Sequence, residues 1–376
     1  MAPGVSKSAV VGGLPDGAQA TRDSLARHGR SSYVPTLDGL RAVAIVGVIV
    51  AHAGRPFVDP FWGDVGHIPV LIFFALSGYL ITTRLLDEYD ATGRIVLRDF
   101  YIRRVFRILP PALLFLATIA FLAWIGVVDC DRRAIRSAVL LYTNYLGDEA
   151  GWTVGHFWSL SVEEHFYLFW PALLVSFGPS QGWRRALALI LALVVWRTLD
   201  ERYHVLGTLF HDPLLDVNDY RTDLIADTLL WGCILAFVLR SSRRFVLTSG
   251  QSMAVAGGSA ALLAFLVLEH VRHATPLAHL LPTILVGAVV LAPQSPLGKF
   301  LETPPVRFLG RVSYSLYIWQ QPFLGPSRPA LPLAIAGAFV CAVISYALIE
   351  QPSIRFGRRL LIKGRQRRFP TAAAEG

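Results

Sequence analysis

The stretch TLDGLRAVAIVGVIVAHAG, residues 36–54, decides the fold of this chain. It consists mostly of Leu, Ala, Val, Ile and Gly, the composition of a membrane helix, yet it also contains Asp38, Arg41 and His52. Eleven residues of helix turn about 20° beyond three full turns and rise roughly 16 Å, so Arg41 and His52 share one face. Asp38 joins that face three residues before Arg41. The stretch therefore predicts a membrane helix with a polar face.

This polar face has two interpretations. An ionisable group in hydrocarbon costs on the order of 3 kcal/mol, so such groups usually face the interior of a helix bundle and indicate function. Alternatively, Asp38 and Arg41 form an anchor pair at the membrane surface, and His52 reaches toward water from the helix end. The rest of the chain has to decide between them.

The composition of the whole chain is that of a helical membrane protein. Of 376 residues, 54% are hydrophobic and 16% are charged, and the mean hydropathy is +0.50. These values exclude an ordinary soluble domain. The net charge of +9 comes without any nucleic-acid-binding motif, so we expect no nucleic-acid partner. Three cysteines, two of them inside apolar runs, exclude a disulfide or zinc framework.

We predict an all-α, polytopic membrane fold of about ten transmembrane helices. The apolar windows are residues 37–54, 67–86, 106–128, 156–178, 184–199, 222–240, 253–271, 277–293, 305–323 and 331–350. A shorter run, residues 134–146, contains Arg136 and Asn144 and predicts a re-entrant or interfacial segment. With both termini in the cytoplasm, the inner segments carry 24 Lys and Arg and the outer loops carry eight, as the positive-inside rule requires.

The chain divides into three predicted parts. Residues 1–34 are rich in Gly, Ser and Pro and lack the apolar core of a signal peptide, so we expect a disordered cytoplasmic tail. Residues 35–352 form the membrane domain, and residues 353–376 form a basic cytoplasmic tail. The outer loop 200–221 is rich in His and Asp, but their spacing fits no compact ligand pattern. We therefore expect no metal and interpret this loop as the polar lip of a cleft.

The stretch DFYIRRVFRILPP, residues 99–111, carries three arginines at the cytoplasmic rim. Arg104 and Arg107 are three residues apart and project the same way from a helix, with Arg103 beside them. Guanidinium groups bind phosphate oxygens through paired hydrogen bonds, so the stretch predicts a site for a phosphorylated cytoplasmic ligand. The alternative is a plain positive-inside anchor.

Two later stretches also place polar groups in apolar surroundings. In GHFWSLSVEEHFYLFWP, residues 155–171, a polar stripe is formed by Ser159, Glu163 and Tyr167, which are four residues apart. Glu163 and Glu164 point about 100° apart, so only one of them is expected to face His52. In RVSYSLYIWQQP, residues 311–322, the aromatic residues predict either an interface belt or a site lining.

Together these stretches resemble the membrane acyltransferase family 3, whose members O-acylate surface polysaccharides, lipids, peptidoglycan and macrolide antibiotics. The matching stretches are LDGLRAVAIVGVIVAHAG with its Arg-x10-His pattern, FFALSGYLIT (73–82), FYIRRVFRILP (100–110), FWSLSVEEHFYLFWP (157–171), SYSLYIW (313–319) and YALIEQP (346–352). They occur in the order of the family across nearly all of residues 36–352.

The resemblance implies an acyl-CoA donor, most simply acetyl-CoA, on the cytoplasmic side of a plasma (inner) membrane. The acceptor would be a hydroxyl of a cell-surface glycan, a glycolipid or a glycosylated natural product, approached from the other side. The residues that match the family's motifs are Arg41, His52, Arg104, Arg107, Trp158, Leu160 and Glu163.

The resulting hypothesis is direct acyl transfer inside the membrane domain. His52 is the expected general base, Glu163 orients it or stabilises its imidazolium, and Arg41 holds the donor or balances Asp38. The expected donor-binding residues are Arg103, Arg104 and Arg107. The expected substrate-binding residues are Asp38, Trp158, Ser159, Glu164, Tyr167, Tyr314 and Tyr317. A covalent acyl-enzyme on Ser159 or Ser161 is the less favoured version.

Two departures from the family and one rival function complete the prediction. The family often has Gln where this chain has His165, and often has His where this chain has Gln320. The rival is a proton-coupled transporter or flippase, since buried Arg, His and Glu also occur in carriers. A carrier does not require paired arginines on the cytoplasmic rim, which favours the acyltransferase.

Overall fold

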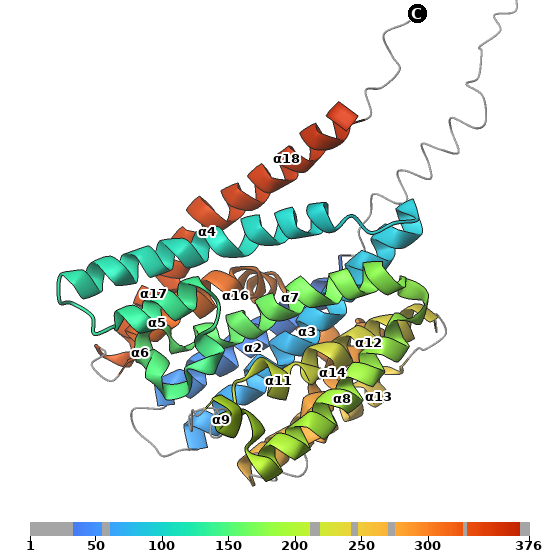
Figure 1. Ribbon diagram of the computed structural model, residues 1–376, viewed down its shortest axis with the longest axis horizontal. Coiled ribbons are helices and arrows are strands. Elements are labelled where there is room, and N and C mark those ends of the chain that lie inside the picture. Colours follow the sequence, from blue (N-terminus) through green and yellow to red (C-terminus); the bar gives the residue numbers. More distant parts are fainter. Residues whose placement is uncertain are drawn as a thin grey trace, which may run out of the picture. The chain divides into compact units, whose positions relative to one another are not determined.

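The computed structural model describes residues 33–54, 61–210, 219–241, 247–269, 275–325 and 329–368 of the protein. Within these ranges all regular secondary structure is helical. The predicted all-α class is therefore confirmed, and Figure 1 shows how the helices are arranged. The predicted disordered tail falls, except for its last two residues, outside the described part of the chain.

Helices occupy all ten predicted windows. Their bounds are α2 (Pro35–Gly54), α3 (Phe61–Thr92), α4 (Leu97–Trp124), α7 (Phe157–Phe177), α8 (Gly182–Tyr203), α11 (Thr222–Ile225) with α12 (Asp227–Ser241), α13 (Ser249–Leu268), α14 (Thr275–Leu291), α16 (Pro304–Phe323) and α17 (Leu331–Ser345). Shorter elements connect them: η2 (Gly147–Ala150), α6 (Gly151–Gly155), η3 (Pro179–Gln181), α9 (Val205–Phe210) and α15 (Pro296–Leu301).

Five stretches of the described chain are long and apolar enough to cross a membrane. They are Pro35–Gly54, Gly66–Thr92, Leu97–Trp124, Ser249–Leu268 and Leu331–Lys363, and Thr275–Leu291 is a shorter apolar helix. The remaining helices carry more polar residues or are shorter. The helices themselves are thus confirmed, whereas ten as the number of membrane crossings stays a prediction.

Two segments differ in detail from the sequence prediction. α4 begins at Leu97, so the arginine-rich stretch 99–111 lies inside the helix, with Asp99 in its first turn, where a negative charge is favourable. The run 134–146 forms the short helix α5 (Arg132–Val139) and the 3₁₀ turn η1 (Thr143–Tyr145). At about 1.5 Å per residue α5 is roughly 12 Å long, too short to cross hydrocarbon about 30 Å thick.

The segment predicted as a basic tail begins as a helix. α17 continues through the π-helical turn η5 (Tyr346–Glu350) into α18 (Gln351–Arg368). α18 lies beside α4 (Figure 1), and the rings of Phe106 and Phe356 pack edge to face with centroids 5.3 Å apart. The π turn matters for the site described below, because it carries the buried carboxylate of Glu350.

The central helices approach one another closely through small residues. α3 packs against α2 and α12, and α2 packs against α16. A methyl group on Gly78 would overlap the Leu229 carbonyl of α12, and one on Gly232 would overlap the Ala75 carbonyl of α3. Close contacts of this kind are typical of helix packing in membranes, where dispersion forces replace the hydrophobic effect between helices. These close contacts hold α3 between α2 and α12, next to the polar residues of the site.

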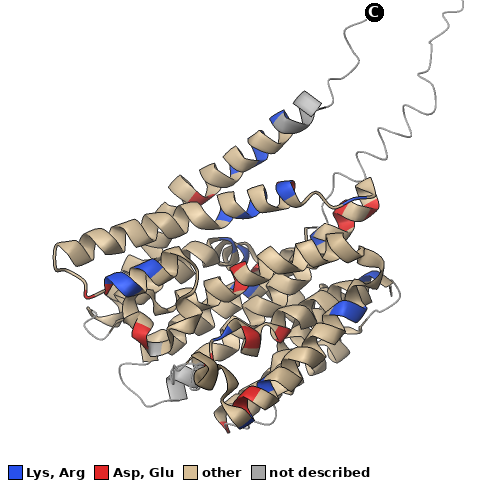
Figure 2. Ribbon diagram, in the orientation of Figure 1, with Lys and Arg blue, Asp and Glu red and all other residues tan. Residues whose placement is uncertain are grey.

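The outward surface of the helices is apolar. Figure 2 shows the helices largely without charged residues along their length. Large apolar side chains point outward instead, among them Leu168, Phe169, Leu191, Phe265 and Leu333. A soluble protein seldom exposes so much apolar surface, whereas a bilayer accommodates it. With the five candidate spans, this surface makes the chain an all-α membrane protein.

Candidate functional site

The polar face of α2 lies against a matching face of α16. Ser313, Tyr317 and Gln320 recur at intervals of four and three residues, so they line one side of α16. Near the start of α2, Nε of Arg41 donates a hydrogen bond to Oγ of Ser313 over 3.2 Å. Near its end, Nδ1 of His52 donates to Oε1 of Gln320 over 2.8 Å. Arg41 and His52 therefore face the bundle interior, as the functional interpretation predicts.

Glu163 of α7 is the centre of a cluster of hydroxyl groups and arginines. Ser77 Oγ donates to its Oε1 over 2.7 Å, and the Tyr167 hydroxyl donates to its Oε2 over 2.9 Å. The guanidinium carbon of Arg104 lies 4.5 Å from the centre of the Tyr167 ring. Arg104 and Arg41 are also within electrostatic range of the carboxylate. The structure thus brings Glu163, Tyr167, Arg104 and Arg41 together, a grouping that the sequence did not predict.

The expected direct contact between Glu163 and His52 is not found among the described residues. Both Glu163 oxygens bind hydroxyls, and Gln320 holds the imidazole. The two residues differ in their distance from the helix ends: Glu163 lies about 9 Å from the start of α7, whereas His52 lies about 3 Å from the end of α2. Glu163 therefore belongs to the arginine end of the site. The sequence placed Glu163 beside His52, whereas the structure places it beside Ser77 and Tyr167.

A second buried carboxylate, Glu350, lies at the same end. Its Oε2 accepts a hydrogen bond from Ser315 Oγ over 2.8 Å, and the side chain is 2% exposed. Arg107 and Arg41 are within electrostatic range of it. The sequence alone suggested no role for Glu350, although this residue lies in the YALIEQP stretch. A carboxylate at the end of the apolar window 331–350 was the feature of the sequence that could have indicated a role for Glu350.

The three rim arginines do not act as one group. Arg104 and Arg107 are half-buried and lie near each other. Arg103 is exposed, and its Nη2 forms an ion pair with Glu88 over 3.0 Å. One helical step of about 100° separates Arg103 from Arg104, which explains why Arg103 faces away from the cluster. The prediction for Arg103 as a donor-binding residue therefore lacks the geometry that Arg104 and Arg107 have.

The His52 end of the site contains a cavity of about 260 Å³. Among the residues that line it are His52, His67, His156, Trp158, Tyr220 and Tyr317. Three of the predicted residues meet here: Ser159 Oγ lies 2.6 Å from the Tyr317 hydroxyl, and Trp158 packs its ring 4.6 Å from that of Tyr220. The histidines and aromatic rings give this cavity walls that suit a hydroxyl-bearing ring.

His156 is a cavity residue that sequence analysis missed. Its Nε2 donates to the Ile318 carbonyl over 3.1 Å, and its backbone N–H donates to Gln321 Oε1 over 3.2 Å. The side chain is 3% exposed and its Nδ1 has no hydrogen-bond partner among the described residues. His156 is a titratable residue directly before α7, within the stretch 155–171. That position was the feature of the sequence that could have indicated its role.

The other predicted substrate-binding residues differ in what they contact. Asp38 lies in the first turn of α2, within electrostatic range of Arg41. Glu164 is half-buried near Arg104, and its Oε1 has no hydrogen-bond partner among the described residues. The Tyr314 hydroxyl donates to the Ile108 carbonyl over 2.7 Å, which links α16 to α4. Tyr314 therefore has a structural contact that the sequence did not reveal.

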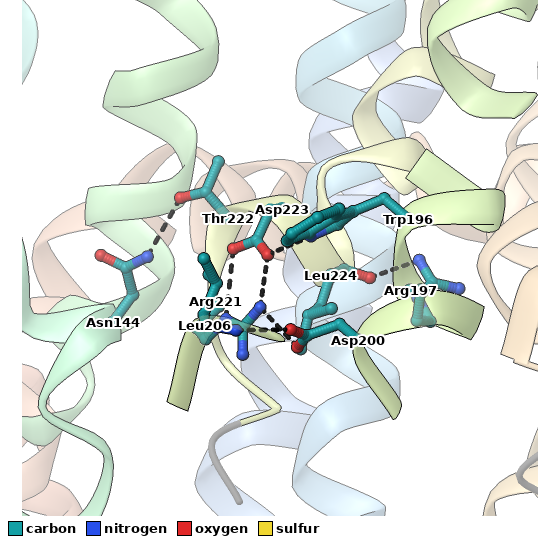
Figure 3. Close-up of polar contacts among 9 residues, drawn as sticks. All are labelled: Asn144, Trp196, Arg197, Asp200, Leu206, Arg221, Thr222, Asp223 and Leu224. Carbon is teal, nitrogen blue, oxygen red and sulfur yellow. Dashed lines mark hydrogen bonds and ion pairs between the residues drawn. The ribbon is translucent and has the colours of Figure 1, made fainter. Parts of the chain in front are cut away.

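A separate group of charges links α8, α11 and α12, and Figure 3 shows the part of it around Arg221 and Arg197. Arg221 is fully buried and forms ion pairs with Asp200 at 2.7 Å and with Asp223 at 2.6 Å. Arg197 pairs with the buried Asp227 at 3.0 Å. Each of these arginines thus has a carboxylate partner, an arrangement typical of a structural network.

This network changes the interpretation of the outer loop. Asp200 was expected at the polar lip of a cleft, but it is 5% exposed and paired with Arg221. Residues 211–218, which carry much of the predicted lip, lie outside the described residues. Beside Arg221, Thr222 accepts a hydrogen bond from Asn144 over 3.0 Å and also bonds His165. These contacts position Tyr220, which lines the cavity.

Comparison with known proteins identifies the family. The family model described as an acyltransferase domain matches residues 34–349. The chain is 31% identical over 373 residues to the peptidoglycan O-acetyltransferase OatA of Listeria monocytogenes, covering 88% of this chain and 57% of OatA. It is 30% identical to the putative peptidoglycan O-acetyltransferase YrhL of Bacillus subtilis, again over 88% of this chain and 57% of the relative.

Putative O-acetyltransferases of Staphylococcus aureus are 30% identical over 89% of this chain and 59% of their own length. The chain thus spans somewhat less than three fifths of the length of these relatives. No solved structure matches it. Because the family model covers most of the chain, from the start of α2 to the π turn, the protein belongs to the acyltransferase family that its sequence motifs resemble.

Proposed function

We propose that the protein is a membrane O-acyltransferase that moves an acetyl group from cytoplasmic acetyl-CoA to a hydroxyl of a saccharide-type acceptor. The observation that carries this proposal is the shared face of α2 and α16, which has an arginine cluster at one end and His52 beside a cavity at the other. The relatives named as peptidoglycan O-acetyltransferases support a glycan acceptor. A cell-surface glycan, a glycolipid or a glycosylated natural product fits the same chemistry.

At the inner end, the proposed donor-binding residues are Arg104 and Arg107, with Arg41 of α2 within electrostatic range of Arg107. None of the three forms an ion pair with a described carboxylate: Arg41 bonds a serine hydroxyl and Arg104 lies over a tyrosine ring. Phosphate oxygens are strong partners for such guanidinium groups. CoA carries its phosphates at the end opposite its thioester, so phosphates at the rim direct the thioester into the bundle.

Phe73 lies between the two ends of the site. The guanidinium carbon of Arg41 is 6.0 Å from its ring centre, and the ring of Tyr317 is 6.4 Å from it. In the proposed reaction the pantetheine arm passes along this ring toward the cavity. Glu163 contributes by balancing Arg41 and Arg104 and by holding Tyr167 under Arg104, which makes it a positioning residue.

At the outer end, His52 is the proposed general base. Its Nδ1–H donates to Gln320, which makes Nε2 the nitrogen that accepts a proton. The acceptor oxygen attacks the thioester carbonyl carbon while its proton passes to Nε2. The carbon–sulfur bond then breaks, the acetyl group stays on the acceptor oxygen, and the imidazolium returns the proton to the departing CoA sulfur.

The proposed location is the plasma (inner) membrane, with both termini in the cytoplasm. The excess of Lys and Arg in the segments between predicted spans supports this orientation. It puts the arginine cluster on the side where acyl-CoA is made and the cavity on the side of the cell surface.

The test is transfer of labelled acetyl groups by the full-length protein in vesicles. His52→Ala is expected to lower the rate by about 10²- to 10⁴-fold, the usual contribution of a general base. His204→Asn, an exposed histidine outside the site whose left-handed conformation Asn tolerates, serves as the control. A His52→Ala protein that transfers acetyl groups at the normal rate would exclude the proposed mechanism.

A second measurement separates the enzyme from a carrier. Acetyl-CoA should raise the melting temperature of the purified protein. At a concentration one hundred times its Kd, it should increase the free energy of unfolding by about 2.7 kcal/mol. A transporter of another solute has no reason to be stabilised. No stabilisation together with no acetyl transfer would overturn the proposal.

A further inference from the structure

Arg84 of α3 shares a helix face with Ser77, the residue that donates to Glu163. Seven residues turn through about 700°, only about 20° short of two turns, and rise about 10 Å along the helix. α3 therefore places Arg84 directly below the Glu163 cluster, toward the end of the bundle where α4 begins. Its side chain is exposed, whereas Arg104 and Arg107 are half-buried.

The charges around Arg84 are mostly of its own sign. Its strongest electrostatic neighbours are all arginines: Arg104, Arg107, Arg41 and Arg103. Asp87 is within electrostatic range, but Arg84 forms no ion pair with any described carboxylate. Other arginines nearby behave differently, since the exposed Arg103 pairs with Glu88 and the half-buried Arg240 pairs with Asp90. Like charges on three helices repel one another, so the cluster is stabilised by an anion with several charges.

We propose that Arg84 binds the outermost phosphate of the donor, the 3′-phosphate on the ribose of CoA. This inference rests on the proposed function. The exposure of the arginines matches the order of groups along CoA: Arg104 and Arg41 lie near Glu163, Arg104 and Arg107 are half-buried, and Arg84 is exposed. Along CoA, the diphosphate likewise lies between the thioester and the 3′-phosphate.

The same phosphate chemistry is present in lipid headgroups and in free phosphate. Both lack the pantetheine arm, so they cannot connect the rim with the Glu163 cluster. A donor that loses only its 3′-phosphate distinguishes these sources, because it changes one phosphate and leaves the rest of the molecule intact.

The experiment measures equilibrium binding of CoA and of 3′-dephospho-CoA to the full-length protein in a zwitterionic detergent. The wild type should bind CoA about tenfold more tightly or better, as expected for one charge-assisted contact. Arg84→Gln should weaken CoA binding to the level of 3′-dephospho-CoA and leave the binding of 3′-dephospho-CoA unchanged. Arg98→Gln, which removes an equally exposed charge from the first turn of α4, is the matched control and should keep the preference.

Three results would overturn the proposal. Arg84→Gln could weaken both ligands equally, or change neither, or have an effect only when anionic lipid is added. Arg104→Gln separates this inference from the proposed function. If it leaves the binding of both ligands unchanged, the donor site itself is in the wrong place. If Arg104→Gln weakens the binding of both CoA and 3′-dephospho-CoA, and Arg84→Gln leaves the preference for CoA unchanged, the donor site is supported and only the role of Arg84 is wrong.

Discussion

Two regions of this molecule bury charged side chains, and they do so in opposite ways. In the network of α8, α11 and α12, each arginine has a carboxylate partner: Arg221 with Asp200 and Asp223, and Arg197 with Asp227. In the cluster around α2, α3, α7 and α16, the charged groups bond hydroxyls or lie over rings. Arg41 bonds a serine, Glu163 bonds a serine and a tyrosine, and Arg104 lies over a tyrosine ring.

The difference separates charges that hold the fold from charges that can receive a ligand. A buried ion pair neutralises both partners, and removing one partner leaves the other unpaired at high cost. A charge solvated by hydroxyls keeps most of its field and can exchange a hydroxyl for a phosphate or a reacting oxygen. The first region should therefore respond to mutation in stability, and the second in activity.

The largest expected effect is on stability, at Asp227. This carboxylate is fully buried and accepts hydrogen bonds from Arg197 at 3.0 Å and from His279 at 2.6 Å. Asp227→Ala should lower the free energy of unfolding by about 3–5 kcal/mol, because it strands a buried arginine. Chemical unfolding in detergent measures this. The double variant Asp227→Leu with Arg197→Leu should recover part of the loss, and an unchanged midpoint for the single variant would contradict the structural role.

The second-largest effect is expected at Glu163, where a substitution should lower activity and leave stability unchanged. Glu163→Gln keeps the shape and one acceptor oxygen but removes the charge that balances Arg41 and Arg104. The kcat/KM for acetyl transfer should fall about 10- to 100-fold, the value of hydrogen bonds to a charged group. The melting temperature should stay within a few degrees of the wild type. A fall in melting temperature as large as that of Asp227→Ala would place Glu163 with the structural charges.

A smaller effect is expected at Arg104. Lysine keeps the positive charge but loses the planar stacking on Tyr167 and the paired donors for phosphate. Arg104→Lys should raise the KM for acetyl-CoA about tenfold, within the usual range of cation–π and charge-assisted contacts. The kcat should change little. Equal KM values for the two proteins would show that Arg104 does not contact the donor.

The smallest effect is expected at Gln320, the partner of His52. The resemblance indicates that related enzymes often have His here, and a neutral imidazole can also accept a hydrogen bond from Nδ1–H of His52. Gln320→His should therefore change the transfer rate by less than about threefold, whereas Gln320→Leu should lower it by about tenfold through loss of one hydrogen bond. Steady-state rates at saturating donor test both, and equal rates for the two variants would contradict the role of Gln320.

Much of the fold could be predicted from the sequence, because helix formation and membrane burial depend on local composition. The shared face of Arg41 and His52 followed from helical geometry alone, and both side chains face the interior. Their partners, Ser313 and Gln320, lie more than 260 residues away and depend on which helices pack together. No local pattern contains that information.

The errors in the site have the same origin. Glu163 was expected at the height of His52, but its height depends on where α7 begins relative to α2. Arg103 was grouped with Arg104 and Arg107, but the neighbouring carboxylate of Glu88 on α3 holds it outside the cluster. Glu350 was overlooked because its burial comes from the π turn η5, which hydropathy does not reveal.

The most direct test of the central claim compares the same substitution in the two regions. Arg41→Gln removes a half-buried arginine and Arg197→Gln removes a buried one, and acetyl transfer and melting temperature are measured on both purified proteins. Arg41→Gln should abolish most of the transfer with a melting temperature close to that of the wild type. Arg197→Gln should melt many degrees lower, yet the molecules that remain folded should transfer at near the normal rate. If both variants lose stability to the same extent, or if Arg41→Gln transfers normally, the distinction between the two regions is wrong.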